Sequence, residues 1–434
     1  MATTRSSLLA ICLAASLALG QNTGRTVRHH KVEVQGGPPP ELAQAEAAIG
    51  KQDYAAAEPL LKKALQADPN NYVAWFDLGF TDHALGKNGE AIAAYRKSVA
   101  AKGDVFESNL NLGILLAEAH QPDAEQFLRA ATKLKPTAEI DEGHARAWMA
   151  LADALEATQP DQAIQAYQQA AALRPKDPDP LLSAGVLLEK QNRPTEAEQE
   201  YKAALAIDPS SKDALTALAN LYMRSRRFSD ARDVLTKLQA LRPSDPAVMM
   251  QLGRLLAAQG KNDQAISQLE AAQKLAPNDP ALRRDLADLY LSQRKFDRAE
   301  AQYRALLAAA PRDAELHDLL GRCILEQKRY AEAQSEFGIA VSLKPDFGAA
   351  YGDLAFAASE NQNYQLTLGA LEKRASLLPE TPITYFLRAT AYDHLRDYKD
   401  ASVNYHKFLE AAEGKFPDQE WQARHRLIAI EPKK

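Results

Sequence analysis

The sequence has only two cysteines among its 434 residues, Cys12 and Cys323. It has no CxxC pair and no HExxH motif, and the histidines after His29 and His30 are scattered. Zinc sites and redox motifs need such spacings, so we expect neither a metal nor another cofactor. Cys323 lies in helical sequence, and we expect it to be a small buried apolar residue rather than a reactive thiol.

An excess of positive charge is also lacking, since the formal net charge is −5. This balance gives no basic surface for nucleic acid or for an anionic membrane. The nearest approach to a P-loop, Gly79 followed by Gly86-Lys87-Asn88, has the wrong spacing and ends in asparagine. No serine lies in a Gly-x-Ser-x-Gly elbow. We therefore expect that the protein is not an enzyme.

Long hydrophobic runs are absent except near the N terminus, where Leu8 to Leu19 is interrupted only by Ser16. This run of about twelve residues is too short for a bilayer core, which needs roughly twenty. A short start containing Arg5 and small residues around Gly20 are typical of a secretory signal peptide. We predict that residues 1–20 are cleaved near Gly20 and that the protein is exported to the periplasm or outside the cell, with no integral membrane span. Cleavage removes Arg5 and changes the net charge from −5 to −6.

The strongest pattern in the sequence is its periodicity. A first series of small residues recurs every 34 positions: Gly185, Ala219, Gly253, Ala287, Gly321, Ala355 and Ala389. A second series follows twelve positions after each of them: Ala197, Ala231, Ala265, Ala299, Ala333, Thr367 and Ala401. Prolines close the units at Pro209, Pro243, Pro277, Pro311, Pro345 and Pro379. Such a period indicates an array of helical repeats.

Each unit predicts two amphipathic helices, because apolar residues recur at three- and four-residue steps on both sides of a polar break. In one unit the first helix is expected at 181–189 and the second from Pro194 to about Ile207, before Asp208-Pro209. Helices joined by so short a turn lie antiparallel, and small residues let their backbones approach. Larger residues fill the remaining space: Tyr167, Tyr201, Leu235, Leu269, Tyr303, Phe337, Leu371 and Tyr405.

This pattern resembles the tetratricopeptide repeat. Trp75-Phe76-Asp77-Leu78-Gly79, followed by Ala91 and Tyr95, carries the resemblance closely, as does Leu252-Gly253 with Ala265 and Leu269. The small-residue series extends back to Ala45. The resemblance implies an all-α fold, a right-handed superhelical solenoid of about eleven repeats over residues 41–413, with a capping helix and tail at 414–434.

Both ends of the array and one internal segment depart from the period. Residues 21–40 lack periodicity and end in glycine and proline, so we expect a flexible linker. The interval from Gly113 to Ala152 is longer than one period, and the surplus at 137–143 predicts a seam where bending is easier. In the final helix, Asp418 to Ile430, we expect Trp421, Leu427, Ile428 and Ile430 to be buried, with Arg424, Arg426 and Lys433 outside.

The resemblance also implies that the first helices line an inner surface, reached by the residues three before and one after each first small site. These inner-face positions predict a partner-binding groove: Phe76, Phe80, Leu110, Ile114, Leu182, Val186, Asn220, Arg254, Arg284, Arg322, Phe356 and Phe386. Phe76 and Phe80 would anchor a segment of another protein, and the arginines would hold its carboxylates. Alternatively, the apolar side chains only pack between helices, and Arg284 with Asp288 and Asp318 with Arg322 satisfy each other.

We therefore expect a non-catalytic scaffold that binds a protein or peptide and helps to assemble or tether a complex of the cell envelope. Two alternatives stay open. The array could present a substrate to a separate enzyme as its accessory subunit, or it could be a structural homo-oligomer.

Overall fold

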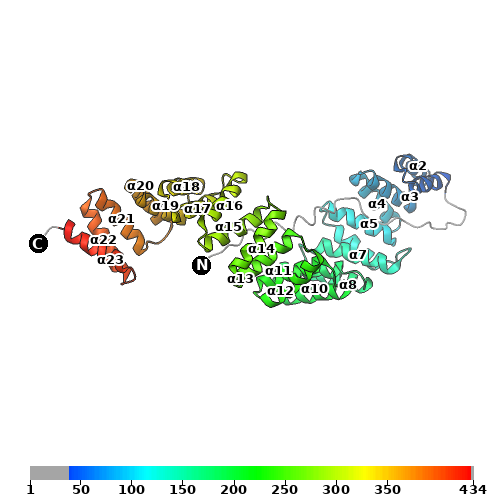
Figure 1. The fold of residues 1–434 in the computed structure, drawn as a ribbon. Helices are drawn as coiled ribbons and strands as arrows, with labels where there is room; N and C mark the ends of the chain where they lie inside the picture. Colours follow the sequence, from blue (N-terminus) through cyan, green and yellow to red (C-terminus); the bar gives the residue numbers. More distant parts are fainter. Residues whose placement is uncertain (1–38, 432–434) are drawn as a thin grey trace. The chain divides into compact units, whose positions relative to one another are not determined.

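The computed structural model describes residues 39–431, and this part of the chain is entirely helical (Figure 1). It contains 23 α-helices and no strand within those residues. The signal peptide and nearly all of the linker expected from the sequence lie outside the described residues, as do the last three residues. The described helices divide into two compact units that meet in sequence at Ser225 and Arg226.

The N-terminal unit holds eleven helices: α1 (Pro40–Gly50), α2 (Tyr54–Ala67), α3 (Tyr72–Ala84), α4 (Asn88–Ala101), α5 (Phe106–Glu118), α6 (Ala124–Ala131), α7 (Ile140–Leu155), α8 (Pro160–Leu173), α9 (Asp179–Lys190), α10 (Pro194–Ile207) and α11 (Lys212–Arg224). The first ten pair into five consecutive antiparallel hairpins, and each hairpin also packs against the next one. The expected helices of the repeat at 181–207 are α9 and α10, so this prediction is confirmed.

The C-terminal unit holds twelve helices: α12 (Phe228–Leu241), α13 (Pro246–Ala258), α14 (Asn262–Leu275), α15 (Pro280–Ser292), α16 (Phe296–Ala309), α17 (Ala314–Glu326), α18 (Tyr330–Leu343), α19 (Gly348–Glu360), α20 (Tyr364–Leu377), α21 (Pro382–His394), α22 (Tyr398–Ala412) and α23 (Pro417–Ile430). Helices α13 to α22 form five hairpins, and α23 packs on α22. Five hairpins in each unit, α11 and α12 on either side of the unit boundary, and the final helix α23 account for the 23 helices of residues 39–431. Their order along the chain is the one that the repeat pattern predicts.

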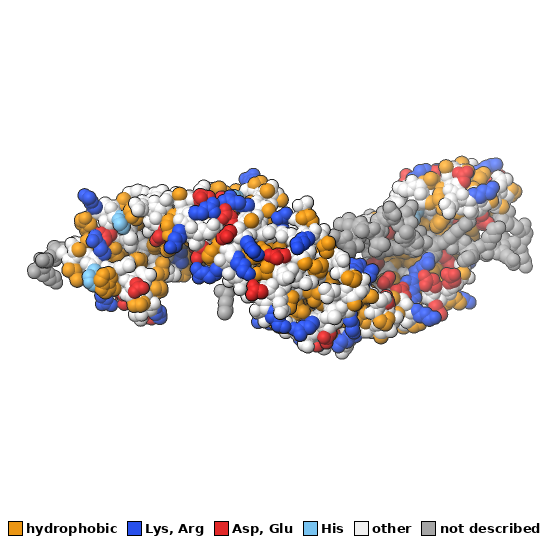
Figure 2. Space-filling view, in the orientation of Figure 1, with side chains coloured by type: hydrophobic (Ala, Val, Ile, Leu, Met, Phe, Trp, Pro, Cys, Tyr) orange, Lys and Arg blue, Asp and Glu red, His pale blue; other side chains and the backbone are white. Residues whose placement is uncertain are grey.

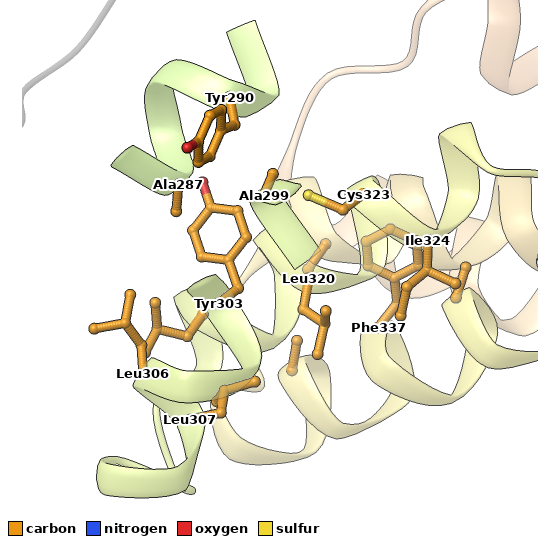
Figure 3. Packing of buried hydrophobic residues seen from close by; sticks show 14 of the residues in the cluster. Ala287, Tyr290, Ala299, Tyr303, Leu306, Leu307, Leu320, Cys323, Ile324 and Phe337 are labelled. Carbon is orange, nitrogen blue, oxygen red and sulfur yellow. The ribbon is translucent and has the colours of Figure 1, made fainter. Parts of the chain in front are cut away.

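The first small site of a repeat is small because a large side chain of the second helix lies against it. A Cβ atom at Gly79 would lie 2.8 Å from Cδ1 of Tyr95, and one at Gly253 would lie 2.6 Å from Cγ of Leu269. These distances are below van der Waals contact, so the helices could not keep their spacing with a larger residue. In the core of the C-terminal unit, alanine takes the corresponding site, where Ala287 lies beside Tyr303 (Figure 3).

Most of the turns inside the repeats contain one residue with left-handed backbone conformation, whereas the turn between α7 and α8 has none. The residues with φ near +60° keep the period of the array in two runs: Gln52, Gly86 and His120, then Asn192, Arg226, Gly260, Arg294, Lys328, Gln362 and Arg396. Only two of these ten residues are glycine, although non-glycine residues adopt this conformation at a cost of roughly 1–2 kcal/mol. The period of the array therefore fixes the backbone of the turn even where the residue type does not favour it.

A further series with the same period caps the first helices at their N termini. The side chains of Ser211, Asp245, Asp279 and Asp313 accept hydrogen bonds from backbone N–H groups in the first turn of α11, α13, α15 and α17, at 2.8–3.3 Å. Such caps satisfy donors that the helix leaves unpaired, and each contributes about 1 kcal/mol. The boundaries of these helices thus follow from local sequence.

The irregular segment at 137–143 is held to α5 by specific contacts. The buried carboxylate of Glu107 accepts hydrogen bonds from the backbone nitrogen and the hydroxyl of Thr137, at 2.9 and 2.7 Å. A Cβ atom at Gly143 would lie 2.7 Å from Cγ of Pro136, so the loop packs closely on the start of α7. The Nε2 atom of His144 lies 2.8 Å from the carbonyl oxygen of Leu134. These contacts oppose the easier bending that the surplus residues suggest.

The final helix buries only part of the stripe that the sequence predicts, since Leu427 is buried and Ile430 half-buried as expected, whereas two other residues of the stripe are exposed. Trp421 and Ile428 are 61% and 73% exposed, whereas Ala423 and Leu427 pack into the core formed with Phe408 of α22. Ala423 stands one full period after Ala389, so α23 continues the first small series and takes the place of a first helix. The repeat register therefore decides which stripe is buried, and the prediction for Trp421 and Ile428 was wrong.

Cys323 is fully buried in the core of the C-terminal unit, beside Leu320 and Ile324 (Figure 3). Burial raises the pKa of its thiol to about 12, and the nearby carboxylates of Glu300 and Asp288 add to this effect. The thiolate, which is the reactive form, is therefore scarcely populated near neutral pH. Cys323 is a packing residue, as the sequence suggests.

Candidate functional site: the inner-face positions and a C-terminal pocket

In the N-terminal unit, the predicted inner-face residues differ in exposure. Phe76 is buried with Tyr95 and Leu112, and its ring centroid lies 5.5 Å from that of Tyr95. Phe80 is half-buried and meets the ring of Tyr54 edge-on at 6.2 Å. The other predicted positions fall into three groups: Leu110 and Ile114 buried, Leu182 half-buried, and Val186 and Asn220 exposed. Phe76 thus contributes to packing between α3, α4 and α5.

In the C-terminal unit, the three predicted arginines are engaged by aspartates of the same chain. The Nε atom of Arg254 donates to Asp285 at 2.5 Å, and that of Arg284 donates to Asp288 at 3.1 Å. The alternative in which Arg284 and Asp288 satisfy each other is therefore realised. The ion pair between Arg254 of α13 and Asp285 of α15 was not expected from the sequence.

Arg322 of α17 joins two carboxylates. Its Nε atom donates to Asp353 of α19 at 2.8 Å, and its Nη2 atom lies 3.1 Å from Asp318. Both links from one first helix to the next have the same sequence separation, since Arg254 meets Asp285 as Arg322 meets Asp353. The pairs tie neighbouring first helices together, so a partner's carboxylate would have to share each guanidinium with an internal aspartate.

Burial raises the pKa values of three aspartates that pair with Arg254 and Arg322. Burial raises the pKa of Asp318 to about 6, and the charge of Arg322 opposes this only in part. One oxygen of Asp318, Oδ1, is buried without a hydrogen-bond partner in the described structure. Burial likewise raises the pKa of Asp285 and of Asp353, against the opposing effects of Arg254 and Arg322. The middle of the C-terminal unit is therefore an internally paired charged surface.

Two inner-face positions, Phe356 and Phe386, line a pocket of about 940 Å³ formed by α19, α21, α22 and α23. This volume is within the range of roughly 300–1,000 Å³ typical of ligand pockets. Its apolar wall contains Phe356, Ile383, Phe386, Leu387, Tyr398 and Trp421. Its polar lining includes Ser359, Glu360, Asp393, His394, Arg396, Gln419, Gln422, His425 and Arg426. Figure 2 shows hydrophobic and histidine side chains close together on these C-terminal helices.

Helix α23 forms one side of this pocket because it is a first helix without a second helix to cover it. Pro417 stands in its first turn, where a missing N–H is tolerated. Gln419 and Arg426 stand one period after Tyr385 and Tyr392 of α21, where a complete repeat would need packing residues. These polar replacements let the uncovered face of α23 meet solvent and the pocket.

The base of the pocket is fixed by a buried carboxylate. Arg426 of α23 donates to both oxygens of Asp393, at 2.6 and 2.7 Å, and the hydroxyl of Tyr405 donates to Oδ2 at 3.1 Å. Burial by itself would raise the pKa of Asp393, but the hydrogen bonds and charge of Arg426 outweigh it and lower the pKa. Burial raises the pKa of Tyr405 to about 12. This bidentate pair locks α23 to α21.

The aromatic groups of the pocket are held in defined orientations. The ring of Phe386 packs on Phe408 at 5.0 Å between centroids. The imidazole of His425 lies 3.9 Å from the ring of Trp421, and its Nδ1 atom lies 2.9 Å from the carbonyl oxygen of the same residue. His394 stacks on Tyr364 at 4.4 Å with the two planes almost parallel. Because these rings are already ordered, binding a ligand here would cost less side-chain conformational entropy.

The sequence pointed to Phe356 and Phe386 but missed the rest of this pocket. Trp421 was expected to be buried and Arg426 to lie outside, and His425 was not assigned to the last helix's buried or outer face. The signal that finds them is the register, because Ala423 continues the small-residue series and so aligns α23 with α21. Among residues 39–431, no group of histidine, cysteine and carboxylate side chains is arranged to hold a metal. Within the same residues, no helix combines the length and apolar character needed to cross a bilayer.

Antiparallel helix pairs that recur with one fixed period define a helical repeat protein. Two family models, both described as tetratricopeptide repeat, match the sequence: one over residues 48–105, 189–255 and 256–323, and the other over 153–212. Together they cover more than half of the chain, which therefore belongs to the tetratricopeptide repeat proteins. No curated protein sequence matches the chain significantly.

Several solved structures are similar. YrrB, described as a tetratricopeptide protein with an unusual peptide-binding site, is 22% identical, covers 43% of this chain and 96% of its own, and has a TM-score of 0.38. Yeast Tom70 is 16% identical, covers 90% of this chain and 94% of its own, and has a TM-score of 0.34. MamA from Desulfovibrio magneticus RS-1 is 21% identical, covers 38% of this chain and 94% of its own, and has a TM-score of 0.37. The assignment to the family rests on the sequence matches.

Proposed function

We propose that the protein is a non-catalytic scaffold that binds a segment of another polypeptide along the inner-face positions of its first helices. Membership of a repeat family that typically mediates protein–protein interaction supports this function. The scaffold is exported after cleavage near Gly20, and it assembles or tethers a complex of the cell envelope. The signal-like sequence of residues 1–20 supports the location.

The observation that carries the proposal is the C-terminal pocket. It combines a ligand-sized volume with the exposed ring of Phe356, which is 40% accessible, and with the exposed Trp421. Soluble proteins seldom leave several large apolar side chains around one hollow unless a partner covers them. The three inner-face arginines carry less weight, because each already has an internal aspartate.

The test is capture of the partner in the native envelope. The mature protein is crosslinked in its own cells, and the recovered polypeptides are identified. Phe80→Ala combined with Phe356→Ala should reduce recovery of the principal partner at least about tenfold, since aromatic side chains within an interface often dominate binding energy. Leu275→Ala, an exposed residue on the second helix α14, is the matched control. Undiminished capture by the double variant would place the site elsewhere.

The two alternatives give different results in the same preparation. An accessory subunit of an enzyme would be recovered with one catalytic chain, and a structural homo-oligomer would be crosslinked to copies of itself. Turnover of a substrate by the purified protein alone would contradict the non-catalytic function.

Export has its own test. The N terminus of the protein recovered from cells should be Gln21 if cleavage follows Gly20. Recovery of protein that still begins at Met1, in the cytoplasmic fraction, would overturn the proposed location without affecting the binding function.

A further inference from the structure

The pocket formed by α19, α21, α22 and α23 has a chemistry that restricts its occupant. We propose that it binds an extended segment of another polypeptide through one aromatic side chain and a carboxylate two residues away, on the same side of the segment. This inference rests on the proposed scaffold function and specifies the partner at one site.

The apolar half of the pocket is shaped for an aromatic ring. Phe356 of α19 and Trp421 of α23 are exposed large aromatics in the pocket lining, and Phe386 of α21 is half-buried there. Because Phe386 is itself packed on Phe408, it offers a rigid surface rather than a mobile one. A ring inserted here would make offset or edge-on contacts with these aromatics, which favour it over an aliphatic chain.

The polar half of the pocket has more hydrogen-bond donors than free acceptors. Of the two carboxylates in the lining, Asp393 is already taken by Arg426 and Tyr405, so Glu360 is the only other one. The donors include the guanidinium of Arg396 and the amides of Gln419 and Gln422. A ligand that fits this lining supplies acceptors.

Arg396 is the group that favours a carboxylate. It is exposed in the turn after α21, where its backbone φ is +64°, and it makes no ion pair with any residue in 39–431. It thus differs from Arg254, Arg284 and Arg322, whose charges are compensated inside the chain. A carboxylate beside the bound ring would gain charge-assisted hydrogen bonds from Arg396. In an extended peptide that carboxylate belongs to the residue two positions from the aromatic one, because residues i and i+2 face the same side.

The probes are three synthetic hexapeptides, acetylated and amidated, with glycine and serine at the remaining positions. The first contains phenylalanine and, two positions later, glutamate. The second has glutamine in place of glutamate, and the third has alanine in place of phenylalanine. The protein is the full chain carrying Trp75→Phe and Trp148→Phe. Of its three tryptophans, Trp421 alone then remains. Because Trp421 is exposed, its emission should shift to shorter wavelength when a peptide covers it.

We expect the phenylalanine–glutamate peptide to bind about tenfold more tightly than the glutamine peptide, and the alanine peptide to bind at least tenfold more weakly than the first. Calorimetry with the unmodified chain should give the same order. Equal affinity for the first two peptides would overturn the proposed role of Arg396. Equal affinity for the first and third would overturn the aromatic site.

Matched variants locate the binding, and calorimetry measures it. Trp421→Ala should weaken binding of the first peptide at least about tenfold. Ile428→Ala should leave it unchanged, since Ile428 is also exposed on α23 but lies outside the pocket. Arg396→Glu should abolish the preference for glutamate over glutamine. Lys328→Glu, at the same left-handed turn position two repeats earlier, should preserve it. Equal losses in a variant and its control would contradict the assignment.

Two further outcomes separate this inference from the scaffold function. If Trp421→Ala abolishes a concentration-dependent dimer instead of peptide binding, a second copy of the chain fills the pocket and the inference is wrong. If Trp421→Ala and Arg396→Glu leave capture of the native partner unchanged, the pocket is not its site, although the scaffold function stands. Loss of that capture in both variants, but in neither control, supports the pocket.

Discussion

A Cβ atom at Gly321 would lie 2.7 Å from Cε1 of Phe337, on the second helix of the same hairpin. Phe337 is fully buried and belongs to the continuous core of the C-terminal unit. The glycine is thus required by one aromatic ring and not by the turn or by the backbone conformation of α17. The spacing of the two helices in this repeat depends on that contact.

Gly321→Ala should destabilise the protein by about 1–3 kcal/mol, because the new methyl group forces the ring or the helix to move. Gly338→Ala on α18 of the same repeat is the control, since nothing lies within 4 Å of a Cβ atom there. The control should stabilise the protein by about 0.5–1 kcal/mol through helix propensity. Urea denaturation followed by circular dichroism measures both changes, and equal effects of the two variants would refute the packing account.

The left-handed turn residues predict a gain in stability on substitution by glycine. Gln362 has a φ of +59° and is exposed. Gln362→Gly should raise stability by about 0.5–1 kcal/mol, because relief of the backbone strain exceeds the entropy that glycine adds to the unfolded chain. Gln362→Val should lower stability, since a β-branched residue tolerates this conformation poorly. Thermal denaturation of the two variants should shift in opposite directions, and a shared direction would show that the turn is not strained.

The buried Asp318 predicts a specific dependence of stability on pH. Its folded pKa of about 6 lies above the ordinary value of 3.8, chiefly because of burial. Between these two values the folded state binds the proton more tightly than the unfolded state. The stabilisation is therefore fully present below about pH 4 and is lost as the pH rises through about 6.

Asp318→Asn removes this contribution and leaves Arg322 its contact with Asp353. When the pH falls from 7 to 4, the unfolding free energy of the wild type should rise relative to that of the variant, by about 2–3 kcal/mol. Asp346→Asn, at an exposed position, serves as the control and should give a curve parallel to the wild type. A difference that does not vary with pH would contradict the burial of an ionisable group at this position.

The contact of Glu107 with Thr137 predicts how the irregular segment moves. Glu107→Ala removes the acceptor of two hydrogen bonds, and amide hydrogen exchange between residues 134 and 142 should accelerate about tenfold to a hundredfold. Glu118→Ala, an exposed position on the same helix α5, should leave this exchange unchanged. If the wild type already exchanges as fast as the Glu107 variant, the segment is a hinge, as its extra length suggested.

The repeat architecture could be predicted from the sequence because close approach of two helices admits only small residues, and these recur in phase. Cys323 could also be placed, since it follows Gly321 on a packed helix. The left-handed turn series was hidden, because eight of its ten residues are not glycine and the repeating geometry overrides their preference. Neighbouring helices set that geometry, and residue type at the turn does not reveal it.

The candidate site was predicted only in part. Phe356 and Phe386 follow from the period, but the pocket also needs Trp421 and Arg426 from a helix that the sequence presents as a lid. An amphipathic stripe within α23 alone misplaces Trp421 and Ile428, whereas the repeat register from Ala389 to Ala423 identifies the buried positions. The pairing of Arg254 with Asp285 joins two first helices, and spacing within one helix cannot show it.

The measurement that tests the central claim most directly is site-specific photo-crosslinking in cells. A photoreactive residue is placed at the inner-face positions Val186 and Phe356 and, as controls, at the exposed second-helix positions Leu275 and Val403. We predict that the inner-face positions become crosslinked to another polypeptide and that the second-helix positions do not. Crosslinks formed only from Leu275 and Val403 would contradict binding through the inner-face positions of the first helices.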